Sequence, residues 1–267
     1  MVRAIVTGAC GKMGKMIRDV ITDSDGISLI GCTETKDHKC IGSEIRLEEA
    51  KAGKIKVVDS LEKIIGSCDV VIDFTAPEAT LSNLEVCREN KKGIVIGTTG
   101  FTPEQKKKIT AASKSIPVVF SPNMSTGVNL VFDLVKRAAE ALGNDYDIEI
   151  SEAHHRYKKD APSGTALKIA EIIAEALGRD LEKSGVYGRK GIVGERKKEE
   201  IGIHSIRAGD IVGDHTVLFC APGERVEIVH RAHSRETFAR GAVRAAKFVA
   251  GKKKGLFDMA DVLGIKR

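Results

Sequence analysis

The chain has 267 residues, of which 42% are hydrophobic, and its 43 Lys and Arg against 37 Asp and Glu give a net charge of +6. This apolar content suffices for a buried core and excludes a disordered chain. Because aromatic residues are only 4% and charges of both signs are interspersed, the small basic excess favours an anionic small molecule over nucleic acid as the partner.

The start of the chain and its cysteines indicate a cytoplasmic, globular protein. The first residues, MVRAIVTG, run directly into a predicted strand without a signal-peptide pattern, and there is no apolar stretch of the about 18 residues that a membrane span needs. The six cysteines lack CxxC spacing, so we expect free thiols in a reducing compartment and neither a disulfide framework nor a zinc site: Cys10, Cys32, Cys40, Cys68, Cys87 and Cys220.

The first half of the chain alternates short apolar runs with helical patterns. The apolar runs predict strands at residues 3–7, 28–32, 56–58, 70–74, 94–97 and 118–121. The helical patterns lie between several of them, at residues 12–21, 61–65, 77–89 and 103–112. Apolar strands separated by helices indicate a Rossmann-type, doubly wound parallel sheet of the α/β class, whose ligands bind beyond the carboxyl ends of the strands. Residues 1–125 are therefore a predicted dinucleotide-binding domain.

A second domain of different design is predicted over residues 126–234. An amphipathic helix at 128–142 leads into a strand at 147–153, and another helix follows at 166–177. Three further strands are predicted at 201–207, 215–220 and 225–231, and the last two are joined by the turn sequence Ala221-Pro222-Gly223. These elements indicate an α+β domain with a mixed sheet. The tail is helical again over 236–248.

A glycine-rich turn follows the first predicted strand. Gly8, Gly11 and Gly14 allow a tight turn and let backbone amides approach a diphosphate at the positive end of the next helix. Their GxxGxxG spacing departs from GxGxxG, so an ordinary strand-to-helix turn is the alternative. Glu34 lies where an acid would bind the ribose hydroxyls of NAD, while Lys36 could meet the 2′-phosphate of NADP. We therefore expect NADH to be favoured, with some use of NADPH.

Two more segments end predicted strands at the same edge of the sheet. Gly97-Thr98-Thr99-Gly100 offers small and hydroxylated residues that can lie beside a nicotinamide ribose, although a plain turn at the end of a strand is equally compatible with it. Ser121-Pro122-Asn123-Met124 ends the sixth strand and marks the crossover to the second domain.

Protonatable side chains are concentrated in residues 152–160, EAHHRYKKD. A histidine there suits a general acid near neutral pH, and the lysines and arginine supply positive charge for a carboxylate. Ser163, Gly164 and Thr165 then open a helix whose free amides can also accept an anion. Two anion-binding devices in one short segment predict a substrate with two carboxylates.

This segment also has simpler interpretations than a catalytic one. His154 and His155 could bind a metal, but neighbours on an extended strand point to opposite sides and no further ligand has suitable spacing, so no metal is predicted. The two histidines could also be surface residues, the lysines solvated charges, and Asp160 and Ser163 only helix caps. The remaining histidines are interpreted as structural: His38, His204, His215, His230 and His233.

The chain resembles the family of 4-hydroxy-tetrahydrodipicolinate reductases, also called dihydrodipicolinate reductases, almost from end to end. The similarity includes GACGKMG at 8–14, DFTAPEATLSN at 73–83, VIGTTGF at 95–101, EAHHRYKKDAPSGTAL at 152–167, RAGDIVGDHTVLF at 207–219 and GLFDMADVLG at 255–264. It implies NAD(P)H-dependent reduction of the cyclic imine derived from 4-hydroxy-tetrahydrodipicolinate to tetrahydrodipicolinate, in lysine and diaminopimelate biosynthesis.

The resemblance also implies roles for individual residues. His154 matches the family's proton donor and Lys158 its assisting catalytic lysine, while the substrate contacts match His155, Gly164 and Thr165. The implied contacts to NAD(P)H are Gly8, Ala9, Cys10, Gly11, Lys12, Met13, Glu34, Thr35, Gly97, Thr98, Thr99, Ser121, Pro122, Asn123 and Met124. Thr35 stands where many members carry Arg, which bears on the use of NADPH.

For the domains, the resemblance implies that residues 235–267 complete the first one and that the sheet of the second builds a homotetramer. Two other functions share the glycine turn and Glu34: a two-domain dehydrogenase acting on an amino acid or a sugar, and an NAD-binding redox regulator without catalysis. Neither is expected to carry the complete run from His154 to Thr165.

Overall fold

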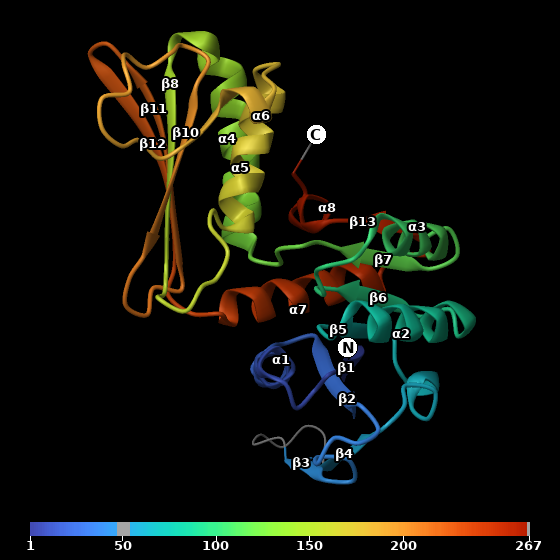
Figure 1. The fold of residues 1–267 in the computed structure, drawn as a ribbon. Coiled ribbons are helices and arrows are strands. Elements are labelled where there is room, and N and C mark those ends of the chain that lie inside the picture. The colour runs from blue at the N-terminus through green and yellow to red at the C-terminus, as the bar shows by residue number, and fades with distance from the viewer. Residues whose placement is uncertain (47–53, 266–267) are drawn as a thin grey trace. The chain divides into compact units, whose positions relative to one another are not determined.

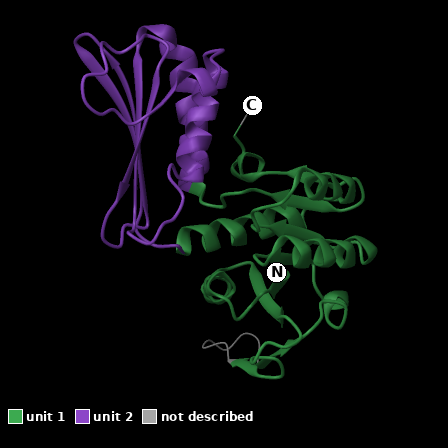
Figure 2. Ribbon diagram, in the orientation of Figure 1, with its two compact units in different colours: residues 1–126, 236–267 green, residues 127–235 purple. Residues whose placement is uncertain are grey.

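A computed structural model describes residues 1–46 and 54–265 of the chain. The chain forms two compact units, which Figure 2 colours separately: unit 1 comprises residues 1–126 and 236–267, and unit 2 comprises residues 127–235. The last two residues of the predicted extension 235–267 lie outside the described residues. Within the described ranges, no helix has the length and apolar character needed to cross a membrane.

Unit 1 is built on a sheet of eight described strands in the order β13-β7-β6-β5-β1-β2-β4-β3 (Figure 1). Neighbouring strands are parallel except β3 and β4. The order reverses at β1, which has β2 on one side and β5 on the other, so ligands are expected beyond its carboxyl end. The strands are β1 Val2–Thr7, β2 Ile27–Thr33, β3 Glu44–Arg46, β4 Lys54–Val58, β5 Val70–Asp73, β6 Gly93–Ile96, β7 Pro117–Phe120 and β13 Gly255–Phe257.

Helices cover both faces of this sheet because successive strand residues point to opposite sides. On β5, Val70 and Ile72 pack into a core that includes residues of α1 and α7, whereas Val71 packs into a second core with α2 and α3. This arrangement confirms the predicted α/β, doubly wound fold. The helices of the unit are α1 Lys12–Thr22, α2 Pro77–Glu89, α3 Pro103–Ala112, α7 Glu236–Ala250 and α8 Met259–Leu263.

Unit 2 packs helices against a mixed sheet of order β12-β11-β8-β10-β9, which confirms the predicted second sheet. β8 is parallel to β10 and antiparallel to β11. Along β8, Ile148 and Ile150 are buried in the core, and Glu152 and His154 continue the same buried face. The elements are α4 Thr126–Leu142, β8 Asp147–His154, α5 Gly164–Ala176, α6 Leu181–Ser184, β9 Gly185–Tyr187, β10 Ile201–Arg207, β11 Gly213–Ala221 and β12 Glu224–Ala232.

The predicted helix at residues 61–65 is wrong. The segment forms turns followed by a short 3₁₀ helix, Ile65–Ser67. Leu61 and Ile65 are both buried, so their apolar character reflects core packing and not a helical face. A segment this short cannot offset the cost of helix nucleation. The brief elements β3, β9, β13, α6 and α8 were not predicted, because three to five residues show no clear periodicity.

The prediction that all six cysteines are free is also wrong, because Cys10 and Cys40 are joined in a disulfide. Cys10 follows β1 and Cys40 lies in the loop after β2, so the parallel pairing of these strands brings the two loops together. A test for CxxC spacing could not find a pair that is 30 residues apart. The other cysteines are free, and of these only Cys220 is partly exposed.

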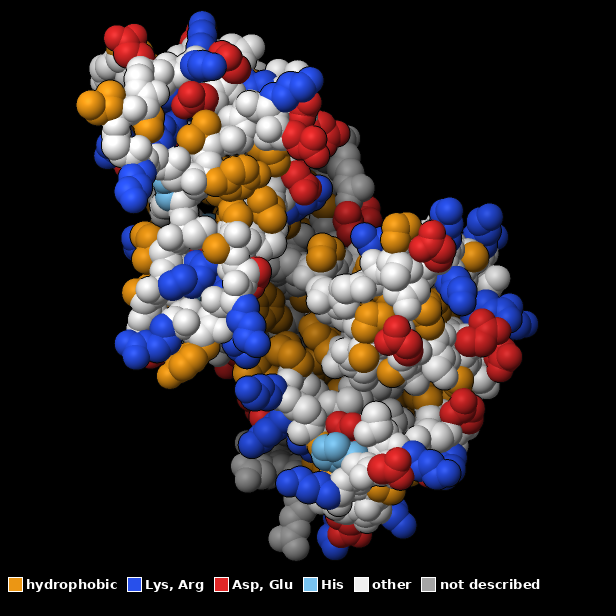
Figure 3. Space-filling model, in the orientation of Figure 1, with side chains coloured by type: hydrophobic (Ala, Val, Ile, Leu, Met, Phe, Trp, Pro, Cys, Tyr) orange, Lys and Arg blue, Asp and Glu red, His pale blue; other side chains and the backbone are white. Residues whose placement is uncertain are grey.

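Charges of both signs are mixed over the visible face of each unit (Figure 3). Some form exposed ion pairs, such as Arg3 with Asp69 and Arg137 with Asp133. Solvent screens such pairs, so the two aliphatic cores of unit 1 and the core of unit 2 carry most of the stability.

Candidate active site

A pocket of about 960 Å³ opens in unit 1 beyond the carboxyl ends of β1, β2, β4 and β5. Its walls include Gly8 and Gly11 after β1, Glu34 and Thr35 after β2, and residues of the first turns of α2. Small-molecule sites have volumes of roughly 300–1,000 Å³, so this pocket can hold a large ligand. It lies at the switch point of the sheet, where a ligand of this fold is expected.

The glycine turn beside the pocket depends on the absence of side chains. Gly8 has φ of +62°, and a Cβ on Gly14 would lie only 2.1 Å from the carbonyl oxygen of Gly8. The helix α1 can therefore start directly against the loop. Its N-cap is Gly11, which has no side chain to cover the first amides. These amides are available to an anion, and the helix dipole favours negative charge there.

Glu34 is held at the edge of this loop. The backbone N–H of Cys10 donates to Glu34 Oε1 at 2.9 Å, and that of Thr35 donates to Oε2 at 3.2 Å. The backbone N–H of Glu34 donates to the carbonyl of Val58 at 3.0 Å. The carboxylate is thus fixed on the pocket wall, whereas Lys36 is exposed.

Asp73, which the sequence analysis did not single out, organises the loops around the pocket. It is fully buried at the end of β5 and accepts hydrogen bonds from the hydroxyls of Thr7 at 2.9 Å and Thr80 at 2.7 Å. Thr98 also donates to it at 3.1 Å and accepts the backbone N–H of Thr75. The Thr98 side chain is therefore part of this buried network. Asp73 begins the DFTAPEATLSN motif, which was the signal that could have identified it.

The neighbouring loop segments are shaped by close packing within unit 1. A Cβ on Gly97 would lie 2.1 Å from the ring of Phe74, so any larger residue there would force that ring to move. The hydroxyl of Ser121 donates to the carbonyl of Asn123 at 2.8 Å, and Met124 is buried. Thr99 is exposed. Backbone groups of residues 97–99 and 121–124 thus follow the carboxyl ends of β6 and β7, on the edge of the sheet that carries the pocket.

The protonatable cluster in unit 2 is centred on Glu152 and His154, at the end of β8. His154 Nδ1 lies 2.6 Å from Glu152 Oε2. Glu152 is 1% exposed and also accepts two hydrogen bonds from Arg207, at 2.7 and 2.9 Å, and one from the backbone N–H of Ser163 at 3.1 Å. A buried carboxylate with this many donors stays ionised and fixes the orientation of the imidazole.

Strand register brings distant residues to this cluster. Parallel pairing of β8 with β10 places Arg207 opposite His154, and antiparallel pairing of β8 with β11 places His215 opposite Glu152. The rings of His154 and His215 meet edge to face, 5.3 Å apart, and His215 Nε2 lies 3.1 Å from Ser163 Oγ. His215, which was interpreted only as a structural histidine, therefore lies against His154. Both Arg207 and His215 belong to the motif RAGDIVGDHTVLF, which was the signal that could have identified them.

The electrostatics of the cluster follow from burial and this pairing. Burial by itself raises the pKa of Glu152, but the hydrogen bonds from Arg207 and His154 outweigh it and lower that pKa to about 2. Burial lowers the pKa of His154 below its ordinary value of 6.5, and Glu152 only partly offsets this effect. Burial, together with the His154 imidazole, lowers the pKa of His215 to about 4. His215 is therefore neutral near pH 7.

The other predicted residues of this segment lie in the following turn and helix start. Lys158 Nζ forms an ion pair with Asp160 at 2.9 Å, and Asp160 lies three residues before the N-cap of α5. Ser163 is the N-cap of α5, and its hydroxyl accepts from the N–H of Ala166 at 3.2 Å. Open space lies beside Gly164, where an added Cβ would meet no atom within 4 Å. Thr165 is the second residue of the same helix.

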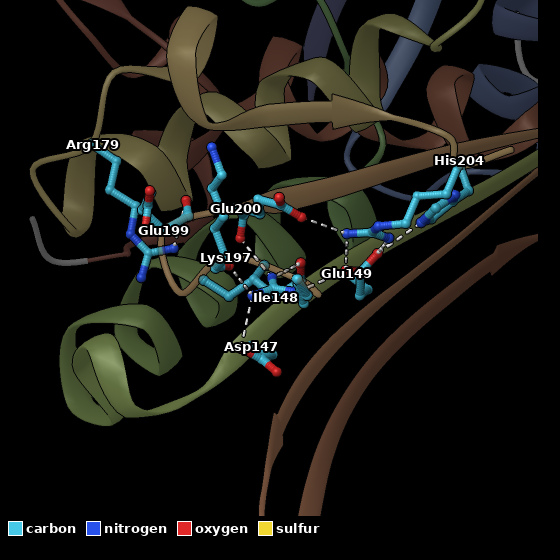
Figure 4. A network of polar contacts seen from close by, with 10 residues as sticks. Asp147, Ile148, Glu149, Arg179, Lys197, Glu199, Glu200 and His204 are labelled. Atoms are coloured by element: carbon cyan, nitrogen blue, oxygen red, sulfur yellow. Dashed lines mark hydrogen bonds and ion pairs between the residues drawn. The ribbon is translucent and has the colours of Figure 1, made fainter. Parts of the chain in front are cut away.

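A second polar network in unit 2 lies on the opposite face of β8 (Figure 4). Glu149 binds Arg189 at 2.9 and 3.0 Å, Arg196 at 3.1 Å and His204 at 2.7 Å. A Cβ on Gly202 would lie 1.8 Å from the Glu149 carboxylate, so glycine leaves room for it. Since Arg189 and Arg196 belong to the segment between β9 and β10, this network fastens that segment to the sheet.

The fold and these sites define a class, the two-domain dehydrogenases and reductases. A DAP dehydrogenase of C. glutamicum, in complex with DAP, has the same fold: the match covers 100% of this chain and 96% of that one, with a TM-score of 0.54 and 14% identity. At this identity the likeness shows the fold alone.

Family models and relatives specify the class further. The model "Dihydrodipicolinate reductase, N-terminus" matches residues 2–124, and "Dihydrodipicolinate reductase, C-terminus" matches residues 127–263. The 4-hydroxy-tetrahydrodipicolinate reductases of Syntrophus aciditrophicus and Geotalea daltonii are 53% and 52% identical to this chain, each over 100% of both sequences. The dipicolinate-bound dihydrodipicolinate reductase of Paenisporosarcina sp. TG-14 is 27% identical, with a TM-score of 0.75 over 100% of both chains.

The chain therefore belongs to the family of 4-hydroxy-tetrahydrodipicolinate reductases. Its activity is that of a reductase in lysine and diaminopimelate biosynthesis, as predicted, and the family uses NAD(P)H.

Proposed function

We propose that NAD(P)H binds in the pocket of unit 1 and that the buried histidine of unit 2 donates the proton that completes reduction of the cyclic imine. In this proposal residues 1–125 and 235–267 bind the dinucleotide, and residues 126–234 bind the substrate. The observation that carries it is the buried contact of 2.6 Å between Glu152 Oε2 and His154 Nδ1. This contact fixes the orientation of the His154 imidazole, so that it can act as a general acid.

The shape of the glycine loop supports the nucleotide assignment. The close approach of α1 to Gly8, made possible by Gly14, places residues 8–13 beside the space assigned to the diphosphate, with the backbone amides of Lys12 and Met13 at the start of α1 as its donors. Glu34 and Thr35 are assigned to the adenosine ribose, and residues 97–99 and 121–124 to the nicotinamide half, at the ends of β6 and β7. When bound, NAD(P)H supplies the hydride.

The choice between the two nicotinamides depends on Glu34. Its carboxylate on the pocket wall can accept hydrogen bonds from the ribose hydroxyls but repels a 2′-phosphate. The exposed Lys36 can offset part of this repulsion, so we assign NADH as the somewhat favoured cofactor, with NADPH tolerated. A comparison of kcat/KM for NADH and NADPH tests this assignment, and a strong preference for NADPH contradicts it.

The substrate is assigned to the turn and helix start that follow His154. Lys158 and the amides of Gly164 and Thr165 provide positive charge and donors for the two carboxylates. The buried Nδ1 of His155 has no hydrogen-bond partner among the described residues. We therefore assign His155 to a substrate contact. The bound dipicolinate of the Paenisporosarcina reductase, a planar ring with two carboxylates, supports a substrate of this chemistry.

Proton delivery follows from the orientation of His154. Because Nδ1 faces Glu152, the other ring nitrogen, Nε2, is the one that can reach a ligand. Residue 213 beside it is glycine, and a Cβ there would lie 3.1 Å from Nε2, so residue 213 leaves its side of the ring open. Addition of hydride to the ring places negative charge on the substrate, and His154 donates one proton to neutralise it. Glu152 stabilises the imidazolium before the transfer, and Lys158 stabilises the developing charge.

The sheet of unit 2 is the proposed surface for a homotetramer. Its outer face, opposite the core side chains Ile148 and Ile150, exposes the apolar side chains of Ile206 on β10 and Val229 on β12. An apolar sheet face of this kind favours association with another copy of the chain. Light scattering coupled to size-exclusion chromatography tests the assignment, for which four copies are expected and a monomer contradicts it.

One assay separates this function from the two alternatives. The protein is mixed with NADH and freshly generated 4-hydroxy-tetrahydrodipicolinate, and oxidation of NADH is followed. Rapid turnover is expected with this substrate, and none with amino acids or sugars. An NAD-binding regulator would bind NADH without turnover, and another dehydrogenase would turn over a different substrate.

A further inference from the structure

Three metal-ligating side chains meet beside the glycine loop of unit 1, outside the groups assigned to catalysis. Cys10, His38 and Cys40 each place one ligand atom in the same space, and these atoms lie within 4.8 Å of one another. His38 Nδ1 lies 2.9 Å from Cys40 Sγ. All three residues are partly exposed, so an ion can reach them from solvent.

The backbone holds these residues in place. The N–H of Ala9 donates to the carbonyl of Thr33, which joins the loop of Cys10 to the end of β2. The loop that carries the other two residues is closed by its own turns, in which Ile41 N–H donates to the carbonyl of His38 and Ser43 N–H to that of Cys40, both at 3.0 Å. Cys10 and Cys40 also pack against the same core of unit 1. The ligand atoms are therefore preorganised.

The Cα separation of the two cysteines is long for a direct bond and also leaves room for an ion between the sulfurs. They are joined in the structure as a disulfide, but their Cα atoms are 7.0 Å apart. Disulfides usually have Cα separations of about 4.4–6.8 Å. Around a tetrahedral Zn²⁺ with Zn–S bonds of about 2.3 Å, ligand atoms lie roughly 3.5 Å apart, which agrees with a cluster confined to 4.8 Å. The nearby nitrogen of His38 has no role in a disulfide, but it is an ordinary ligand for zinc.

We propose that Cys10, His38 and Cys40, in the dithiol form, bind one thiophilic cation of the Zn²⁺ class next to the nucleotide pocket. Two thiolates and one imidazole are a donor set typical of zinc, and the fourth position is left to water. The disulfide and the metal-bound form exclude each other, because a sulfur bonded to sulfur cannot act as a thiolate ligand. The bound ion would link the glycine loop to the loop after β2.

The proposal is tested on the full chain with Co²⁺ as a spectroscopic substitute for Zn²⁺. The protein is first reduced with a water-soluble phosphine, which with one water molecule converts the disulfide to two thiols and becomes phosphine oxide. The phosphine is removed without oxygen, and Co²⁺ is titrated. We expect one Co²⁺ per chain, with thiolate-to-metal charge-transfer bands and tetrahedral ligand-field bands, and displacement of Co²⁺ by Zn²⁺.

Matched variants identify the ligands. Cys40→Ser and Cys10→Ser are expected to weaken Co²⁺ binding by about 100-fold or more, since even residues outside the ligand set change metal affinity about 10–100-fold. His38→Ala should weaken binding at least about tenfold and keep thiolate bands. Cys220→Ser and His233→Ala, which replace a partly exposed cysteine and an exposed histidine elsewhere, should leave binding unchanged.

Each outcome of this experiment decides the proposal. A disulfide that survives the phosphine, reduced protein that does not bind Co²⁺, or binding that persists in the Cys40→Ser and His38→Ala variants overturns it. Circular dichroism shows whether each variant is folded, and if Cys10→Ser unfolds, the Cys40→Ser and His38→Ala variants decide the proposal. The readout is metal binding and not turnover, so it is independent of the proposed reductase mechanism.

Discussion

Two glutamates on strand β8 have the same kinds of partners but very different surroundings. Glu149 binds Arg189, Arg196 and His204, as Figure 4 shows in part, and Glu152 binds Arg207 and His154. In both cases these hydrogen bonds outweigh burial and lower the pKa of the carboxyl to about 2.

The difference between the two networks is exposure. The residues are three apart, so their side chains point to opposite faces of the sheet. The Glu149 side chain is 21% exposed and that of its histidine partner 36%, whereas the corresponding values are 0% for Glu152 and 11% for His154. Solvent weakens the first network, which fastens a surface segment. Burial strengthens the second network, which holds the His154 imidazole in one orientation and shifts its pKa.

The largest expected effect comes from removing the acid. His154→Ala should lower kcat by roughly 100-fold or more with a modest change in KM, because general acid catalysis contributes about 10²–10⁴-fold. His204→Ala, the matched histidine on the other glutamate, should keep a near-normal kcat. Steady-state kinetics with NADH and freshly generated substrate provide the measurement. Near-normal kcat in His154→Ala, or equal losses of kcat in both variants, would contradict the assignment of only the Glu152 network to catalysis.

The two glutamates should differ in their contribution to stability. Glu152→Gln leaves Arg207 without its carboxylate in a buried site, so the free energy of unfolding should fall by about 3 kcal/mol. Glu149→Gln weakens a partly exposed network and should cost about 1 kcal/mol or less. Urea denaturation followed by circular dichroism measures both values. Equal losses would contradict the distinction drawn from burial.

Lys158 is expected to have a smaller effect on catalysis. Loss of a hydrogen bond between charged groups costs about 1.5–3 kcal/mol, so Lys158→Ala should lower kcat/KM by about 10–100-fold. Its neighbour Lys159 is exposed, and Lys159→Ala serves as the matched control with little expected change. The same kinetic assay measures both variants, and a comparable loss in Lys159→Ala would mean that the whole basic segment acts through its net charge.

The pH dependence of kcat/KM should report His154. The free enzyme must carry the protonated imidazole, and burial lowers the pKa of this group below 6.5. The value of kcat/KM should therefore be constant below that pKa and fall about tenfold per pH unit above it. In Glu152→Gln the fall should begin at lower pH, because the carboxylate raises the pKa of His154. A value of kcat/KM that rises toward alkaline pH would contradict the role of protonated His154 as the acid.

Much of this architecture was predictable because it follows from local patterns. The apolar strands of unit 1, helices α2 and α3 with their N-terminal prolines, and the helix start after Ser163 all have clear sequence signals. The glycine turn and Glu34 were found by their spacing, and His154 and Lys158 by resemblance to a family.

The partners of these residues were not predictable, because they come from strand register. Arg207 reaches Glu152 across 55 residues, and His215 lies opposite Glu152 only because β11 pairs with β8 in one particular register. Asp73 binds threonines from three other segments, and Cys10 meets Cys40 through the pairing of β1 with β2. A single sequence does not specify strand register to the residue, and a shift of one residue in register moves every side chain of that strand to the other face of the sheet.

The most direct test of the Glu152–His154 pair is a nitrogen-15 NMR titration of the His154 imidazole. Because Nδ1 faces an ionised carboxylate, we expect the neutral ring to keep its proton on Nδ1 and to titrate at Nε2, with a pKa below 6.5. A neutral ring with its proton on Nε2, or a pKa above 6.5, would contradict the assignment of His154 as an acid oriented by Glu152.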